Sequence, residues 1–232
     1  YKEEIIMKKI LLSLAVVLVY IMPANAEVTR ALGLTVSSAT IESSLKDDID
    51  SNGTVNTRKD ISNDIAYGSI FLEVTNDLGA GSITFGVDVI PMEAEFDAKT
   101  VAQSSLKAKG DGAATTGNNK GTVDVSQHIT AYVQPGYVMP NGMTVFLTAG
   151  YVTADVDAEV QSISSTNKTE SLSLDGIKLG GGIKADLPND MFVKLEYALT
   201  DYDDISVTTS NNTKVTADMD NEALSLSLGK KF

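Results

Sequence analysis

Apolar and polar residues alternate one by one over most of this chain. In the segment 83–89, isoleucine, phenylalanine and two valines occupy the odd positions, and threonine, glycine and aspartate occupy the even ones. Successive side chains of a β-strand point to opposite faces, so a period of two predicts strands with one apolar and one polar face. The pattern recurs at 32–37, 70–74, 83–89, 125–134, 145–151, 177–187, 193–200 and 224–232. The sequence therefore predicts an all-β fold with eight strands.

The connections between these segments alternate strictly between short and long. The short ones are rich in Asn, Asp, Gly and Pro and lie at 76–81, 140–142 and 188–190. The long ones are polar and lie at roughly 43–64, 93–122, 155–173 and 203–220. Short turns on one side and long loops on the other are typical of bacterial outer-membrane barrels. We therefore expect residues 27–232 to form an antiparallel up-and-down transmembrane β-barrel of eight strands.

The polar strand faces carry charged residues in mid-strand. They are Glu73, Asp88, Lys178, Lys184, Lys194 and Glu196. A soluble β-sandwich would also alternate, but its inward face would be the apolar one. An eight-stranded barrel has an interior just wide enough to be filled by side chains. We therefore expect the acids to pair with the lysines in a lumen charge network that plugs the barrel, in preference to an ion pathway.

The N-terminal segment has the pattern of a cleaved export signal. Two lysines follow Met7, an apolar stretch covers 10–22, and a small-x-small ending stops at Ala26. The stretch is shorter than the ~20 residues that a spanning helix needs. We expect 7–26 to be a signal helix and 1–6 to be an untranslated leader, because codons for its Lys-Glu-Glu can hold a ribosome-binding sequence. Upstream DNA without that purine run would exclude the leader hypothesis.

The composition argues against several kinds of chemistry. The chain has no cysteine, one histidine, and 18 basic against 31 acidic residues, a net charge of -13. Without cysteine there is no disulfide, no thiolate metal site and no lipid-modified cysteine. The acidity disfavours nucleic acid as a partner. Removing residues 1–26 takes away three lysines and two glutamates, so the exported chain is one charge more negative. We expect no cofactor.

His128 is the candidate for catalysis. Ser126 and Asp124 precede it at alternate positions, which predicts all three on one face of a strand. Side chains in such a row stand ~7 Å apart, beyond hydrogen-bond reach, so we expect no enzyme. A lipid-modifying outer-membrane enzyme centred on His128 remains an alternative, which replacement of this residue would test.

The first long connection contains half of a calcium-binding motif. Asp48, Asp50 and Asn52 place oxygen ligands at alternate positions before Gly53. The twelfth position of the motif should be a bidentate glutamate, and Lys59 stands there instead. An acidic, solvated loop is the favoured interpretation, and calcium binding is the weaker one.

The segment before the last strand resembles the penultimate hairpin of a known family. Residues 187–197 read Leu-Pro-Asn-Asp-Met-Phe-Val-Lys-Leu-Glu-Tyr, and Thr-Asp-Tyr follows at 200–202. A turn leading into a Leu-Glu-Tyr strand and a Thr-Asp-Tyr end resembles the small opacity-protein and OmpA/OmpX-like outer-membrane barrels. The resemblance implies an eight-stranded outer-membrane barrel whose function varies with its loops.

The final strand ends on an aromatic residue. Leu224, Leu226, Leu228 and Phe232 share one of its faces, which resembles the insertion signal that the barrel assembly machinery recognises. Lys230 departs from that signal, because an apolar residue usually occupies its position.

The resemblance implies a monomer in the outer membrane of a Gram-negative bacterium, in contact with lipid and with an unknown extracellular ligand. We expect a non-enzymatic role in surface interaction or envelope integrity. Transport is the alternative, because a further hairpin around 101–123 would raise the strand count to ten and leave a narrow porin-like channel. Single-channel conductance would detect such a pore.

Overall fold

The computed structural model describes residues 28–48, 53–55, 57–91, 94–106, 115–161, 168–208 and 214–232. Its strands are β1 (Val28–Asp48), β2 (Thr57–Asp77), β3 (Gly81–Ile90), β4 (Ala94–Leu106), β5 (Thr115–Val138), β6 (Thr144–Gln161), β7 (Lys168–Leu187), β8 (Met191–Thr208) and β9 (Lys214–Lys231). The leader and the signal helix fall outside the described residues and stay predictions. Within the described ranges, no helix is long and apolar enough to cross a membrane.

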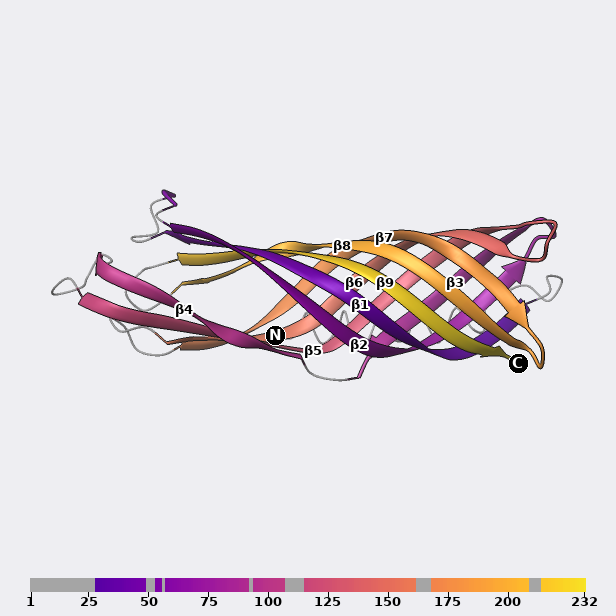
Figure 1. The fold of residues 1–232 in the computed structure, drawn as a ribbon, viewed down its shortest axis with the longest axis horizontal. Coiled ribbons are helices and arrows are strands. Elements are labelled where there is room, and N and C mark those ends of the chain that lie inside the picture. Colours follow the sequence, from indigo (N-terminus) through magenta and orange to yellow (C-terminus); the bar gives the residue numbers. More distant parts are fainter. Residues whose placement is uncertain are drawn as a thin grey trace.

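The strands close into one antiparallel barrel (Figure 1). β1 pairs with β2 on one side and with β9 on the other, β2 pairs with β3, and β5 to β9 pair in chain order. β3 and β4 pair with successive stretches of β5, because Ile90 lies opposite His128 and Ala94 lies opposite Val125. These two strands therefore share one position in the wall, and the nine strands make a barrel of eight positions. The predicted eight-stranded up-and-down fold is confirmed.

The apolar face of the strands is the outer face of the barrel. Leu34, Leu147 and Leu226 are 63%, 66% and 57% exposed, whereas Thr148 and Ser225 on the inner face are buried. A soluble sandwich would have the opposite arrangement. An apolar exterior around a polar interior is the arrangement that suits lipid as the surrounding medium.

The four long connections are mostly paired hairpin, which corrects the prediction of long loops. The outermost paired residues are Asp47 with Thr57, Leu106 with Thr115, Val160 with Lys168, and Thr208 with Lys214. Continued pairing satisfies the backbone N–H and C=O groups. The parts of the strands beyond the apolar band are surrounded by water, so they lack a lipid-facing row of apolar residues. Without that row, the alternation does not predict them as strands.

The hairpin considered around 101–123 exists but adds no wall position. Its arms are β4 and β5, which continue strands already counted. Pro91, which has no backbone N–H, follows the last residue of β3. The ten-stranded alternative is therefore wrong.

Candidate functional site

Aromatic rings fill the half of the lumen near the short turns. Phe71 and Phe192 are 2% and 0% exposed, and their ring centroids lie 6.1 Å apart. Each ring covers a glycine directly opposite on the neighbouring strand, Gly33 for Phe71 and Gly229 for Phe192. A Cβ atom on either glycine would overlap the ring. The narrow lumen accepts a large ring only where the facing residue has no side chain.

Two more pairs follow the same rule. Tyr132 covers Gly86, and Phe146 covers Gly182, again directly opposite on paired strands. The four pairs lie at the interfaces β1/β2, β3/β5, β6/β7 and β8/β9. Each of the eight wall positions therefore takes part in one ring–glycine pair, and each outer hairpin contains one such pair.

A buried ion pair lies among these rings. Lys194 on β8 pairs with Glu73 on β2, and their side chains are 4% and 2% exposed. The Nζ atom of Lys194 is 4.5 Å from the centroid of Phe71, and the Tyr132 hydroxyl donates a 2.7 Å hydrogen bond to Glu73. Removing one partner of such a pair leaves a buried, uncompensated charge. This ion pair and the surrounding rings are called the plug below.

A second ion pair lies next to the plug. The Nζ atom of Lys178 is 3.2 Å from Oε1 of Glu196. Gln134 donates a 3.0 Å hydrogen bond to Thr148 and lies 3.4 Å from the other oxygen of Glu196. The inward-facing amide of Gln134 therefore links β5 to both β6 and β8.

Asp88 and Lys184 have other partners. Asp88 accepts a 2.7 Å hydrogen bond from Ser69, and Lys184 Nζ lies 4.5 Å from the ring centroid of Phe192. Neither takes part in the ion pairs found between described residues. Of the six predicted lumen residues, four thus form two acid–lysine pairs, while Asp88 and Lys184 bind a hydroxyl and a ring face.

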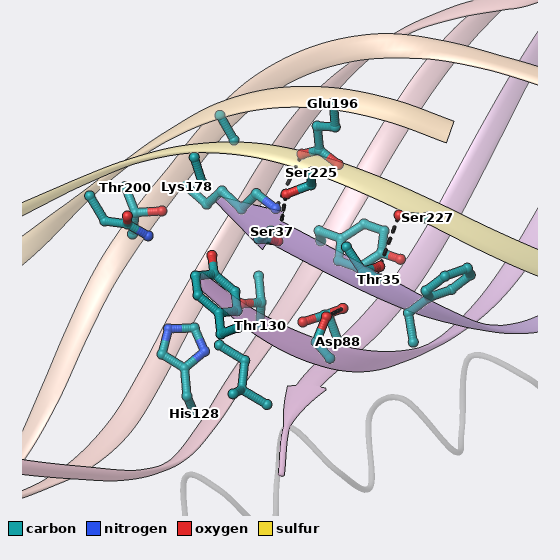
Figure 2. A pocket seen from close by; sticks show the side chains of 18 of the residues that line it. Thr35, Ser37, Asp88, His128, Thr130, Lys178, Glu196, Thr200, Ser225 and Ser227 are labelled. Atoms are coloured by element: carbon teal, nitrogen blue, oxygen red, sulfur yellow. Dashed lines mark hydrogen bonds and ion pairs between the residues drawn. The ribbon is translucent and has the colours of Figure 1, made fainter. Parts of the chain in front are cut away.

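A polar cavity lies on the outer-hairpin side of the plug (Figure 2). We call it the chamber, and its lining includes Asp88, His128, Lys178, Glu196 and Asn221. Its volume is about 40 Å³. At 10–15 Å³ for each water, the chamber has room for about three water-sized groups.

Hydroxyl groups on one wall of the chamber bind one another. Ser37 is 2.8 Å from Ser225, and Thr35 is 2.8 Å from Ser227, in both cases between β1 and β9 (Figure 2). The hydroxyls of this wall are therefore hydrogen-bonded in pairs across the β1/β9 interface.

The barrel has a second apolar core beyond the chamber. Ala154, Val156 and Leu174 are fully or almost fully buried, and Val125 and Tyr202 pack against them. The even positions 154 and 156 of β6 point inward, whereas the apolar odd positions 145–151 point outward. The apolar residues change faces where the surroundings change from lipid to water. This change of parity is the sequence signal by which the outer core could have been found.

The predicted row of His128, Ser126 and Asp124 is broken by a β-bulge after Ser126. Val125 packs into the outer core, so its neighbours Asp124 and Ser126 point outward. His128 points inward, lines the chamber and has its Nε2 atom 3.0 Å from the Tyr202 hydroxyl. The prediction of one shared face was therefore wrong, because a bulge adds a residue and reverses the alternation.

The calcium candidate is only partly described. Asp48 accepts a 2.7 Å hydrogen bond from the backbone N–H of Gly53, whereas Asp50 and Asn52 lie outside the described residues. Among the side chains that the structure does describe, no group of three or more His, Cys, Asp or Glu is placed to hold a metal. Calcium binding by this segment stays a prediction.

The C-terminal strand presents its apolar residues to the outside. Leu224, Leu226 and Leu228 are about half exposed, and Phe232 is 71% exposed. The backbone N–H of Phe232 donates a 2.9 Å hydrogen bond to the carbonyl of Arg30. The last residue is thereby held at the edge of β1, and its role in insertion stays a prediction.

Acidic residues gather on the outer face just beyond the apolar band. Glu42, Asp220 and Asp201 stand side by side on β1, β9 and β8. Desolvation, followed by the charges of Asp201, Asp218 and Glu42, raises the pKa of Asp220 above its usual value. The surface between membrane and hairpin tips is therefore strongly negative along these three strands.

The chain matches one protein family over almost its whole length. Residues 10–232 match the outer membrane protein beta-barrel domain. A comparison with curated proteins found no match.

Several solved outer-membrane proteins are similar to this chain at low sequence identity. Ail, the attachment invasion locus protein of Yersinia pestis, is 11% identical, with 86% of this chain and 99% of that chain covered and a TM-score of 0.38. Neisserial surface protein A is 10% identical, with coverages of 86% and 97% and a TM-score of 0.36. The outer-membrane protease OmpT of Escherichia coli is 10% identical, with coverages of 92% and 99% and a TM-score of 0.48.

The family match agrees with the closed eight-position barrel, the apolar exterior and the polar, filled interior. We conclude that the chain is an outer-membrane β-barrel and belongs to the outer membrane protein beta-barrel domain family.

Proposed function

We propose that this protein is a non-enzymatic barrel that holds its outer hairpins at the cell surface for surface interaction or for envelope integrity. The observation that carries the proposal is the division of the interior. The plug of Lys194, Glu73 and four rings fills the lumen inside the membrane, while the outer core around Val156 and Leu174 supports the hairpins beyond it. A filled lumen suits a rigid support for binding surfaces.

The surroundings of His128 support a non-enzymatic role. A general base needs a nucleophile within hydrogen-bond reach, and the hydrogen-bond partner of His128 is the hydroxyl of Tyr202 in the interior. Ser126 and Asp124 face the opposite side of the wall. The relatives above include both an attachment protein and a protease, and at these TM-scores neither activity is transferred to this chain.

The charge of the outer surface favours a neutral or basic partner. Ail has been solved with a heparin analogue, which is a polyanion. Here the row of Glu42, Asp220 and Asp201 would repel a polyanion approaching the sides of the hairpins. The acidic row therefore argues against a polyanion, such as the heparin analogue bound to Ail, as the ligand of this protein.

Hairpin replacement tests the proposal. In one form, residues 162–167 and 209–213 are replaced by Asn-Gly turns, which leaves the paired strands in place. In a second form, Glu42→Gln, Asp201→Asn and Asp220→Asn together neutralise the acidic row. Cells producing each form are compared for adhesion to polylysine-coated and heparin-coated surfaces and for sensitivity to detergent. We expect a loss of adhesion to the basic surface or a gain in detergent sensitivity. Unchanged behaviour in both assays, with the barrel still assembled, would contradict the proposal.

Conductance separates this proposal from the transport alternative. The purified protein is inserted into a planar bilayer, and its current is recorded at a fixed voltage. The unaltered protein should give no steady ion-conducting steps. Regular steps from the unaltered protein would establish a channel.

A further inference from the structure

The outer half of β2 has one edge without a neighbouring strand. β2 pairs with β3 only between Ile70 and Asp77, whereas its pairing with β1 continues up to Thr57. Among the described strands, β1 is therefore the only neighbour of residues 57–69. Such an edge presents a row of backbone N–H and C=O groups that can form a ladder with a further strand. We call the edge of residues 57–69 the docking edge.

The side chains of the docking edge are open to solvent on the outer face. Arg58 and Asp60 have side chains that are 60% and 71% exposed, and Ser62 and Asp64 are exposed as well. Ile61, of the opposite parity, is half-buried. The Nε atom of Arg58 lies 3.1 Å from Asp60, and the guanidinium has four further N–H donors. One oxygen of Asp64 accepts a 2.7 Å hydrogen bond from a threonine of β1, so its other oxygen can accept from a partner.

The sequence of the docking edge is complementary to itself in one antiparallel register. Residues directly opposite each other share a face, so the symmetry axis between two identical strands passes through a residue. With the axis at Ile61, Arg58 of each copy lies opposite Asp64 of the other. In the same register, Asp60 of each copy lies opposite the hydroxyl of Ser62. Opposite charges in directly opposed positions stabilise a strand pair.

The neighbouring registers are less favourable. An axis at Asp60 places that carboxylate opposite its own copy, and an axis at Ser62 places Asp60 opposite Asp64. An axis at Lys59 brings two lysines together, and an axis one residue beyond Ser62 gives no pair of opposite charges. Like charges directly opposite each other destabilise a strand pair. Of the registers centred on residues 59–63, only the one at Ile61 joins opposite charges without opposing like ones.

Antiparallel pairing also decides where the second copy stands. All copies in one membrane have the same orientation, so their β2 strands run together from the outer hairpins toward the short turns. Such strands cannot lie antiparallel to each other. Copies in two facing membranes present their hairpins to each other, and the docking edge lies in the hairpin half of the molecule, beyond β3 (Figure 1). The second copy therefore belongs to a facing membrane.

We propose that two copies of this protein in facing outer membranes pair through their docking edges, antiparallel and centred on Ile61, and so hold cells together. This inference rests on the proposed function of the hairpins at the cell surface and names a second copy of the chain as the partner. The backbone hydrogen bonds of the new ladder supply affinity, and the pairs of Arg58 with Asp64 fix the register.

Clumping of cells that produce the full chain tests the proposal. Settling is followed at about 0.15 M salt, where a Debye length of ~8 Å screens the general repulsion between acidic hairpins. Arg58→Asp and Asp64→Arg each oppose like charges in the ladder, so each population alone should settle no faster than cells without the protein. A mixture of the two populations should clump again, because the altered residues then face opposite charges.

Two control variants separate this effect from that of net charge. Lys46→Asp and Asp218→Arg make the same changes of charge on β1 and β9, which have neighbouring strands on both sides. Both should clump like the unaltered protein. A mixture that stays dispersed, or clumping that follows net charge in all four variants, would overturn the proposal. Adhesion to polylysine that persists while the mixture stays dispersed would leave the surface role intact and remove the self-pairing alone.

Single cysteines test the register, because the chain has none of its own. Opposed residues of an antiparallel pair have Cα atoms ~4.5–5.5 Å apart, within the range of a disulfide. Ile61→Cys should therefore give disulfide-linked dimers in clumped cells under mild oxidation. Asn63→Cys, on the same face, would lie ~13 Å from its own copy and should remain monomeric. Clumped cells in which Ile61→Cys gives no dimer, or no more dimer than Asn63→Cys, would overturn the proposal.

Discussion

At the scale of single residues, the interior is filled by pairs of residues, and each member of a pair fits inside the barrel only when the other is present. A ring needs the glycine opposite it, and Lys194 needs Glu73. Alternation placed these residues on the inner face, because parity alone decides which side of a strand a residue occupies. Which acid meets which lysine could not be predicted, since Glu73 and Lys194 are 121 residues apart and meet through the register of intervening strands.

Substituting the glycine of a ring–glycine pair should destabilise the barrel. In Gly229→Ala the new Cβ would overlap the ring of Phe192, and overpacking of this kind typically costs about 1–3 kcal/mol. Urea unfolding in detergent measures the loss. Gly68→Ala is the matched control, because its nearest atom beyond the chain neighbours would lie 3.7 Å away, and it should change little. A loss as large for Gly68→Ala would show that strand glycines matter here for another reason.

Breaking the buried ion pair should cost more than removing it. Lys194→Met leaves Glu73 charged in the plug and is expected to destabilise by about 3–5 kcal/mol. The double variant Lys194→Met with Glu73→Gln removes both charges and keeps an acceptor for the Tyr132 hydroxyl, so much of the loss should be recovered. A double-mutant cycle of unfolding free energies measures this coupling. Strictly additive losses would mean that the two charges do not depend on each other.

At the scale of strands, each long strand serves two surroundings. Up to residue 151 the apolar side chains at odd positions of β6 face lipid, and beyond it Ala154 and Val156, at even positions, face the outer core. An alternation with one apolar face throughout predicts the strands within the membrane, and it predicts loops where the strands continue beyond the membrane. A bulge such as the one after Ser126 also shifts the alternation by one residue, and no turn residue announces it.

Weakening the outer core should loosen the hairpins and leave the membrane barrel intact. Leu174→Ala removes a side chain that is 4% exposed, a change that typically costs about 2–5 kcal/mol. Hydrogen exchange should speed up in β6 after Val152 and in β7 before Gly176, which lies opposite Val152, and stay slow in the membrane segments. Val55→Ala, at a site 54% exposed, is the control. Uniform loss of protection along all strands would show that the hairpins and barrel unfold as one unit.

The acidic row should make the hairpins more stable in acid. Because the pKa of Asp220 is raised above 3.8, the folded state binds its proton more tightly than the unfolded state. Above the folded pKa the ionised row is destabilising, and this cost disappears as the pH falls through the folded pKa toward 3.8. Asp220→Asn should therefore stabilise at neutral pH by less than about 1 kcal/mol, as expected for exposed like charges, and give no gain below pH 3.8. A gain that persists in acid would contradict the electrostatic cause.

At the scale of the whole molecule, the barrel has two chemically different ends. One end has tight turns at residues 78–80, 139–143 and 188–190, and the other has four paired hairpins with their own core. Outer-membrane barrels place short turns in the periplasm and long connections outside, so the acidic hairpins are expected to face the medium.

An epitope tag tests this orientation. A tag inserted between residues 162 and 167 should bind antibody on intact cells. The same tag inserted in the turn between Asn141 and Gly142 should bind only after the outer membrane is permeabilised. Labelling of the second site on intact cells would mean that the barrel sits the other way round.

The four ring–glycine pairs have a consequence for how such a barrel can change. Each pair lies within one hairpin, so each hairpin contains both the ring and the glycine that together fill its share of the lumen. A duplicated, exchanged or redesigned hairpin would bring its ring and its glycine with it and would leave the neighbouring rings undisturbed. The natural unit of inheritance and of engineering in this barrel is therefore the hairpin, and covariation between ring and glycine should mark its limits in related sequences.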